Sequence, residues 1–321
     1  MTNSKMHLPL PTFSFVIPAY NEASDIADTL EAAWAQRYPA REVIVVDDGS
    51  TDATRAILRE LKNAGRELTL IEHQKNRGIA ATRNTGLLAA SGDVVVFLDA
   101  DDHPAPDFLQ RLVPLYQQGV ESVCVESRVE HQDVIGRYIQ AEHELYYVGG
   151  KWVGFSAAFS CRREVALAVL FPEELPGAEE VEFFARLMDR GFSCATDFSI
   201  VVGRRFPTSI RGFRRQWVAR ARPVPYVCHR VRGRRTAIVV GRRALVTAWA
   251  LAMTLAIVPA AIEAFRRARK SPRDLRDLPA FWFLYHVQLV ARRTGEWRGV
   301  LEILRSGRGF ASSHGALSRI E

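Results

Sequence analysis

The 321-residue sequence contains only four cysteines, and no two of them are spaced as a CxxC pair. This spacing argues against a zinc site or a disulfide framework, and it favours buried thiols in a reducing compartment. No GxGxxG or GxxxxGK[ST] motif lies near the first predicted strand, which disfavours a dinucleotide dehydrogenase or a P-loop enzyme. The first residues, MTNSKMHLPLPTF, lack a basic start followed by a long apolar run, so no signal peptide is predicted.

Acidic residues are missing from the stretch between Gly203 and Arg243, which contains thirteen arginines. The following nineteen residues, 244–262, carry no charge and approach the length that spans a bilayer. Basic residues next to an apolar helix favour contact with anionic lipids on the cytoplasmic side. We therefore predict that residues 207–321 form an Arg-rich, helical, membrane-associated region at the cytoplasmic face of the cell membrane. No nucleic-acid-binding motif accompanies the arginines, so nucleic acid is not expected as a partner.

The positive-inside rule does not choose an orientation of this apolar segment in the membrane, because both of its flanks are basic: four basic residues also follow it at positions 266–270. The segment could span the bilayer, lie in its interface, or pair with residues 278–290 as a re-entrant hairpin. Aromatic residues in this second segment suit an interfacial depth, namely Phe281, Trp282, Phe283 and Tyr285.

Strands and helices alternate regularly in the first hundred residues. Apolar runs predict buried strands at 13–17, 42–46, 68–72 and 93–98, and helical patterns follow each of the first three. Such alternation is typical of an α/β fold with a mixed, largely parallel sheet flanked by helices. Beyond it we predict a helix at 106–116, strands at 121–129 and 152–160, and helices from 162 and over 178–190.

Three of the predicted strands end in polar turns, PAYNE, DDGSTD and DADD, at residues 18–22, 47–52 and 99–102. The carboxyl ends of parallel strands share one edge of the sheet, which is where ligands bind in such folds. Asp99 and Asp101 are two residues apart, so they point the same way in an extended chain and would repel each other without a cation. Alone, this motif could be an acidic surface turn. Together, the three turns predict a site for Mg or Mn and a phosphorylated ligand.

Four ordered motifs carry a family resemblance: FSFVIPAYNEASDIADTL, EVIVVDDGSTDAT, NRGIAATRNTGLLAASGDVVVFLDADD and PGAEEVEFFARLMDRGF. They resemble the inverting, GT-A fold glycosyltransferases of family 2, from about Phe13 to Phe206. The resemblance implies transfer of a sugar from a nucleotide diphosphate sugar to an acceptor hydroxyl, with a divalent cation as cofactor. It divides the chain into an extension (1–12), a nucleotide-sugar-binding half (13–105), an acceptor half (106–206) and the C-terminal region.

The same resemblance assigns roles to individual positions. It places Asp99 and Asp101 in the DxD element, which meets the ribose, the metal and the diphosphate. Residues lining the nucleoside pocket would be Pro18, Tyr20 and Glu22, with Asp47 and Asp48 near the base and Arg83 shaping the pocket.

The catalytic base is expected from the pair Glu179 and Glu180 at the start of a predicted helix. Inverting transfer needs a carboxylate that takes the acceptor proton, and the resemblance points to Glu180, with Glu179 as the second candidate. On a helix Glu180 shares a face with Phe183, Phe184 and Leu187, so it is expected to face the apolar side. The alternative is an acidic first turn that only complements the helix dipole.

The expected function is synthesis of a cell-surface polysaccharide or glycolipid, with a glycan or glycolipid as acceptor. Two alternatives remain: an inactive nucleotide-sugar-binding subunit of a membrane complex, and a polyprenyl-phosphate glycosyltransferase. The latter is weakened by DADD in place of the DADLQ of dolichyl-phosphate sugar synthases. Residues 214–217, RRQW, scramble the Gln/Arg/Trp motif of processive relatives, so transfer of one or a few sugars is expected.

Overall fold

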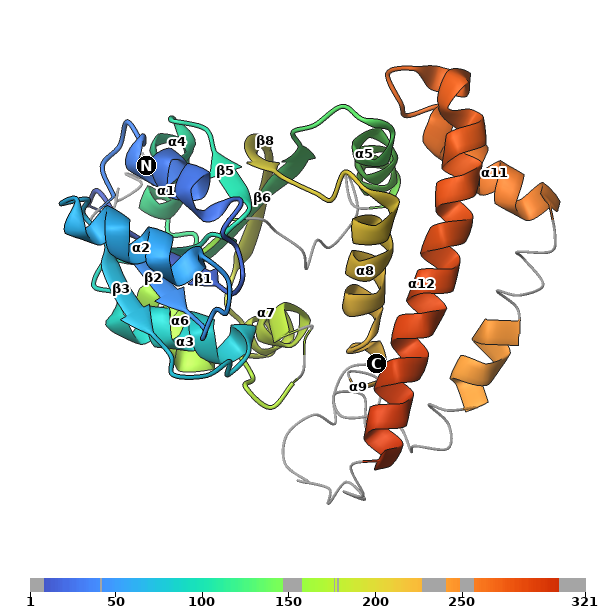
Figure 1. Ribbon diagram of the computed structural model, residues 1–321. Coiled ribbons are helices and arrows are strands. Elements are labelled where there is room, and N and C mark those ends of the chain that lie inside the picture. The colour runs from blue at the N-terminus through green and yellow to red at the C-terminus, as the bar shows by residue number, and fades with distance from the viewer. Residues whose placement is uncertain are drawn as a thin grey trace. The chain divides into compact units, whose positions relative to one another are not determined.

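The computed structural model describes residues 9–40, 42–146, 158–175, 177, 179–226, 241–248 and 257–305. The described chain divides into two compact units, coloured along the sequence in Figure 1. The first unit comprises the described residues up to His131, those between Tyr146 and Glu174, and Glu179–Phe206. The second comprises Gln132–Leu145, the short segment 175–178 and the described residues from Pro207 onward. Part of the predicted acceptor half, residues 132–145, thus belongs to the second unit.

An eight-stranded mixed sheet forms the centre of the first unit, with strand order β3-β2-β1-β4-β7-β6-β8-β5. The first four strands of this order are parallel, and β6 and β8 are also parallel, whereas β7 and β5 pair antiparallel with their neighbours. The strands are β1 (Phe13–Ala19), β2 (Glu42–Asp47), β3 (Thr69–Glu72), β4 (Val94–Phe97), β5 (Asp102–Pro104), β6 (Ser122–Val129), β7 (Phe159–Arg162) and β8 (Cys194–Arg204).

Helices cover both faces of this sheet, because β1, β2 and β4 are apolar on both faces. Alternate residues of β1 enter different cores: Phe15 and Ile17 pack in one, and Val16 in the other. The first core includes α1 (Ile26–Trp34), α2 (Thr54–Asn63) and α4 (Phe108–Gln117), and the second includes α3 (Ile79–Ala89), α6 (Arg163–Val169) and α7 (Glu179–Asp189).

Helix α3 lies very close to β1, and this closeness fixes the side chains that α3 presents to the site. A Cβ atom at Gly86 would collide with the side chain of Val16, so a larger residue would push the helix away from the sheet. The Asn84 amide also binds the backbone of Phe171 twice, at 2.9 Å through Phe171 N and at 2.9 Å through Phe171 O. Helix α3 is therefore held from the sheet side and from the loop after α6.

Most predicted elements of the first unit are present, with ends shifted by a few residues. Two strands of this unit, β5 and β8, were not predicted, and neither was helix α5 (Val134–Tyr146), which lies almost wholly in the second unit. Of the strand predicted at 152–160, residues 152–157 lie outside the described chain, and β7 begins at Phe159. Strand β5 has three residues and includes a proline, so only its pairing with β8 identifies it as a strand.

The second unit is helical. Besides α5 it contains α8 (Ile210–Ala221), α9 (Val224–Tyr226), helical residues 241–248, α11 (Ile257–Ala268), η2 (Asp274–Asp277) and the long α12 (Leu278–Arg305). Gly295 lets α12 approach α8, because a Cβ there would collide with the Val218 carbonyl. Buried polar contacts join α5 to the later helices, including the ion pair of Arg137 with Asp277 at 2.7 Å.

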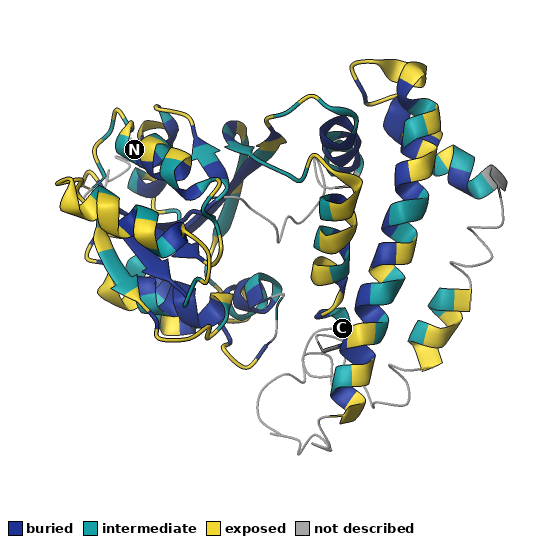
Figure 2. Cartoon of the chain, in the orientation of Figure 1, coloured by how far each residue is buried: buried dark blue, intermediate teal, exposed yellow. Residues whose placement is uncertain are grey.

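The aromatic residues predicted for an interfacial depth divide into two pairs. Phe281 and Tyr285 are buried within the helical unit, whereas Trp282 and Phe283 are exposed, as the alternating colours along α12 in Figure 2 illustrate. Across the helices that the structure describes, none combines the length and the apolar character needed to cross a membrane. Of the apolar segment predicted at 244–262, residues 249–256 lie outside the described chain.

Candidate active site

The turns that follow β1 and β2 are joined to each other at the carboxyl edge of the sheet. Asn21 adopts a left-handed conformation with φ of 59°, and its side-chain oxygen accepts a hydrogen bond from Thr51 N at 2.8 Å. In return, Ser50 Oγ accepts a hydrogen bond from Asn21 N at 3.0 Å. The two polar turns therefore form one structure, which exposes the Tyr20 ring at its surface.

Asp47 and Asp48 are buried beneath these turns, and their carboxylates bind groups of the protein itself. Asp47 accepts a hydrogen bond from Arg55 Nε at 2.8 Å. Asp48 contacts His73 Nδ1 at 2.7 Å and accepts from Arg77 N and Gly78 N, both at 2.9 Å. Through these contacts both aspartates shape the turns. That they lie near the base of a bound nucleotide stays a prediction.

The remaining residues predicted for the nucleoside pocket lie in or after β1. Pro18 is buried at the end of the strand, whereas Tyr20 is 43% exposed and offers a ring face for stacking. Burial, followed by the charge of Asp101, raises the pKa of Glu22 to about 7. Glu22 is therefore close enough to the acidic turn after β4 to respond to its charge.

Asp99 lies between the buried Arg83 and the partly buried Arg204. Its Oδ1 binds Arg83 Nη2 at 2.9 Å and its Oδ2 binds Arg204 Nη2 at 2.5 Å. Burial alone would raise the pKa of Asp99, but the charges of Arg204 and Arg83 outweigh it and lower this pKa to about 2. Arg204 Nη2 also binds Asp101 Oδ1 at 3.1 Å, so the two acids of the DxD element converge on one cationic nitrogen.

Arg204 was not predicted as a site residue. Its place in the sequence, at the start of the arginine run, suggested contact with lipid headgroups. The structure instead pairs Arg204 with Asp99 and Asp101, and Arg205 with Asp25 and Asp28, so both arginines bind acids of the first unit. This pairing depends on contacts between distant strands, which a local sequence pattern does not reveal: β8 places Arg204 opposite Asp102 of β5.

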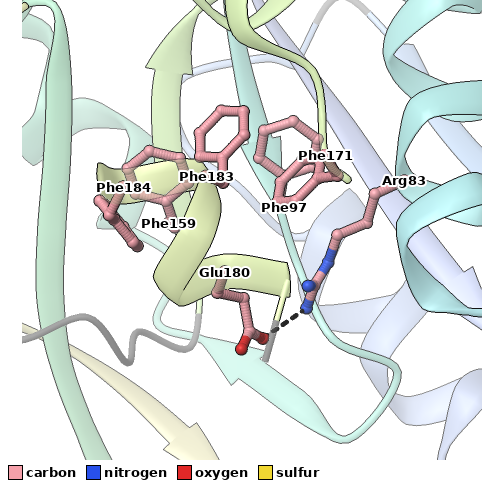
Figure 3. A pocket seen from close by; sticks show the side chains of 7 residues that line it. All are labelled: Arg83, Phe97, Phe159, Phe171, Glu180, Phe183 and Phe184. Carbon is pink, nitrogen blue, oxygen red and sulfur yellow. Dashed lines mark hydrogen bonds and ion pairs between the residues drawn. The ribbon is translucent and has the colours of Figure 1, made fainter. Parts of the chain in front are cut away.

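Arg83 connects the acidic turn after β4 to the start of α7. Its side chain is 5% exposed and donates to Glu179 Oε1 at 2.6 Å and to Glu180 Oε1 at 3.1 Å, in addition to Asp99. Figure 3 shows Arg83 reaching Glu180 beside a group of phenylalanine rings. One buried guanidinium thus holds both glutamates of the predicted catalytic pair and an acid of the predicted metal site.

The two glutamates of α7 have different surroundings. The Glu179 side chain is 4% exposed and that of Glu180 is 32% exposed, so Glu180 is the one that an acceptor can reach. Glu180 and Arg83 line a small pocket together with five aromatic residues, Phe97, Phe159, Phe171, Phe183 and Phe184. Burial, and then the neighbouring charge of Glu180, raise the pKa of Glu179 to about 7. Glu180 does line the aromatic pocket, as expected for the apolar side, but Glu179 and not Glu180 is the more buried of the two glutamates.

We expect the raised pKa of Glu179 to make stability depend on pH. In the unfolded chain this carboxyl has a pKa near 4.5, so between pH 4.5 and about 7 the folded protein holds a proton that the unfolded chain has released. The contribution of Glu179 to the free energy of unfolding therefore falls as pH rises through this window. In Glu179→Gln the fall should be smaller, because only other groups with a raised pKa, such as Glu22, still contribute to it. Urea unfolding in EDTA at several pH values measures it, and equal slopes for both proteins would contradict the prediction.

The predicted metal site consists of two carboxylates. Asp99 and Asp101 offer hard oxygen ligands, and both already reach the same cationic atom of Arg204, so they are placed to share one cation. Among the described residues, no group of three or more His, Cys, Asp or Glu side chains is arranged around a common metal position. Two carboxylates fit Mg or Mn that is completed by phosphate oxygens and water, because Mg²⁺ sites often use one or two carboxylates together with substrate phosphates.

Comparisons with known proteins identify the family to which this sequence is similar. Residues 14–167 match the family model described as Glycosyl transferase family 2. Glycosyltransferase AglE of Haloferax volcanii is 41% identical over 104 residues, which are 32% of this chain and 34% of AglE. The amylovoran biosynthesis glycosyltransferase AmsB of Erwinia amylovora is 38% identical over 199 residues, which are 56% of this chain and 65% of AmsB. The matches therefore span less than two thirds of either relative.

A solved structure supports the fold. The mannosyltransferase PcManGT from Pyrobaculum calidifontis, in complex with GDP-Man and Mn2+, matches with a TM-score of 0.54 at 21% identity. The match covers 96% of this chain and 77% of PcManGT. This similarity confirms the predicted mixed α/β fold of the GT-A type.

Proposed function

Because the chain belongs to Glycosyl transferase family 2 through residues 14–167, we propose that it is an inverting glycosyltransferase that uses a nucleotide diphosphate sugar. The observation that carries this proposal is the position of Arg83. Its guanidinium binds Asp99, at the proposed donor and metal site, and Glu180, the proposed base. The groups for donor binding and for proton transfer are thereby held at a fixed separation.

In the proposed reaction, an acceptor hydroxyl attacks the anomeric carbon of the donor sugar. The new bond joins the acceptor oxygen to that carbon, and the bond from the carbon to the diphosphate oxygen breaks. The hydroxyl proton goes to Glu180, and the nucleotide diphosphate leaves with the electron pair of the broken bond. Attack opposite the leaving group inverts the configuration, and a positioned base of this kind contributes about 10²- to 10⁴-fold to the rate.

Asp99 and Asp101 are the residues proposed to hold the divalent cation, Mg or Mn. When bound, such a cation would supply positive charge that stabilises the leaving diphosphate. Support comes from their oxygen ligands, their convergence on one cationic atom, and the Mn2+ in the structure of PcManGT. Tyr20 and Glu22 lie at the same edge and are proposed to contact the nucleoside.

The Asp101→Ala variant should lose metal-dependent donor binding and keep its fold. Asp101 contributes one of the two proposed metal ligands, whereas its side chain is 27% exposed and lies outside the two cores. Calorimetric titration of UDP and GDP with and without Mn²⁺ measures the effect, and circular dichroism checks the fold. Metal-dependent binding equal to that of the wild type would contradict the assignment.

The activity itself is tested by incubating the full chain with a panel of nucleotide sugars and Mn²⁺ or Mg²⁺. Release of nucleotide diphosphate, as donor hydrolysis or as transfer, supports an enzyme. Metal-dependent binding without turnover would favour the second candidate, a nucleotide-sugar-binding subunit. The acceptor is proposed to be a cell-surface polysaccharide or glycolipid, since relatives such as AmsB are named for biosynthesis of this kind. A polyprenyl phosphate remains a further acceptor to include in the panel.

We also propose that the second unit binds anionic lipid at the cytoplasmic face of the membrane. Ile262, Phe265 and Arg266 are about half exposed, and their spacing of i, i+3 and i+4 puts them on one face of α11; Arg269, which is also exposed, follows directly after the helix. A face that combines apolar and basic residues suits a membrane interface. We expect the full chain to cosediment with phosphatidylglycerol vesicles, which are anionic, but not with phosphatidylcholine vesicles. A Phe265→Ser variant that binds as well as the wild type would count against this surface.

A further inference from the structure

Arg204 is fixed to the acidic turn by its backbone. Strand β8 pairs antiparallel with β5, so that Arg204 is opposite Asp102, and Arg205 N donates to Asp101 O at 3.1 Å. The side chain of Arg204 therefore starts beside the DxD element and needs no rearrangement to reach it. It is 19% exposed, so it is largely removed from water.

The Arg204 guanidinium occupies the space between the carboxylates that are proposed to hold a metal. Nη2 lies 2.5 Å from Asp99 Oδ2 and 3.1 Å from Asp101 Oδ1, while Nε lies 3.6 Å from Asp102 Oδ1. Asp102 is fully buried, and this Oδ1 accepts no hydrogen bond. Three carboxylates thus share one guanidinium, and oxygen atoms that suit a metal are already bound by a cation of the protein.

A divalent cation and Arg204 cannot both be bound closely by these oxygens, because two cations at one position repel each other strongly in a partly buried site. The balance of charge around the site nevertheless favours binding of a further cation. Arg83 and Arg204 face five carboxyl groups, which are those of Asp99, Asp101, Asp102, Glu179 and Glu180. When all are ionised the acids are in excess, and an anionic donor adds to that excess.

We propose that Arg204 is an internal counter-cation that holds Asp99 and Asp101 together until a divalent cation replaces it. This inference rests on the proposed function, because it assumes a metal and a nucleotide diphosphate at this site. Once replaced, the Arg204 guanidinium is available to the phosphates of the donor. Metal and nucleotide diphosphate therefore bind cooperatively: the metal alone competes with Arg204, and the diphosphate offers Arg204 another anion. By thermodynamic linkage, each ligand tightens the binding of the other.

The test measures Mn²⁺ binding to the full chain by the electron paramagnetic resonance signal of free Mn²⁺, without nucleotide and with UDP or GDP. In Arg204→Met, Mn²⁺ alone should bind about tenfold more tightly than in the wild type, within the usual range of coupling between sites. The additional tightening caused by the nucleotide should be smaller in the variant. Arg204→Lys keeps the charge without the planar fork and should be intermediate.

Arg205→Met is the matched control, because it removes the same charge one residue away. Arg205 pairs with Asp25, Asp28 and Glu130, and its side chain is 41% exposed. The Mn²⁺ affinity of Arg205→Met should equal that of the wild type.

If Arg204 only stabilised the fold of the site, Arg204→Met would bind Mn²⁺ more weakly than the wild type. Weaker or unchanged binding in a folded Arg204→Met or Arg204→Lys protein overturns the inference and leaves the proposed function standing. If neither Mn²⁺ nor a nucleotide binds any of the proteins, both proposals fail.

Discussion

Replacing Glu180 with glutamine should reduce turnover by about 10²- to 10⁴-fold and leave donor binding nearly unchanged. Glutamine has almost the same shape and can keep its contact with Arg83 Nη2, but it cannot accept the acceptor proton. Glu180 is also the more exposed of the two glutamates, so an incoming hydroxyl can reach it. Single-turnover transfer measures the loss, and calorimetry with donor and Mn²⁺ measures binding.

The matched variant Glu179→Gln separates the two candidate bases. Glu179 is buried and binds Arg83 Nη1, so its replacement should affect stability more than proton transfer. Near-normal turnover in Glu180→Gln together with a large loss in Glu179→Gln would move the role of base to Glu179. Near-normal turnover in both variants would show that neither glutamate of α7 is the catalytic base.

Replacing Arg83 with methionine should abolish transfer and destabilise the first unit by about 3–5 kcal/mol, the cost of leaving buried charges unpaired. Three carboxylates lose their common partner, and two of them, Glu179 and Asp99, have little exposure to water. Urea unfolding at pH 8 measures the change, because Glu179 is then largely ionised. The free energy of unfolding of Arg83→Met should partly recover in a double variant that also carries Glu179→Gln.

The control for this prediction is Arg77→Met on the same segment of chain. Arg77 is 47% exposed and its guanidinium lies 3.4 Å from Glu173, so its loss should cost less than about 1 kcal/mol. If Arg83→Met were no less stable than Arg77→Met, the network around Arg83 would not contribute to folding as proposed.

The sequence predicts the donor side of the fold well, because its signals are local. Strands β1, β2 and β4 are continuous apolar runs, and each ends in acidic or polar residues that mark the carboxyl edge. Asp99 and Asp101 could be named from these motifs, whereas Arg83 was assigned only through the family resemblance; the structure pairs Asp99 with Arg83, and Asp99 and Asp101 with Arg204. The fold class followed from the same alternation of strands and helices.

Residues that depend on distant pairing could not be predicted in this way. Arg204 is 105 positions from Asp99, and it stands next to Arg205 at the start of the arginine-rich stretch, so it resembled part of a basic surface. Strand β5 is too short to recognise without β8. The burial of Glu179 likewise depends on Arg83, which is 96 positions away. In each case the deciding contact joins segments that no local pattern connects.

The double attachment of Asn84 to Phe171 has a consequence for the entropy of binding. Arg83 directly precedes Asn84 in α3, so its backbone is already fixed by these two hydrogen bonds. Its guanidinium is in addition held by three carboxylates. The conformational freedom of this long side chain is lost when the protein folds, not when substrates arrive. Ordering a long side chain during binding costs about 0.5–1.5 kcal/mol. Donor and acceptor would thus meet a site whose central cation is already ordered, and more of their binding energy would remain for the transition state.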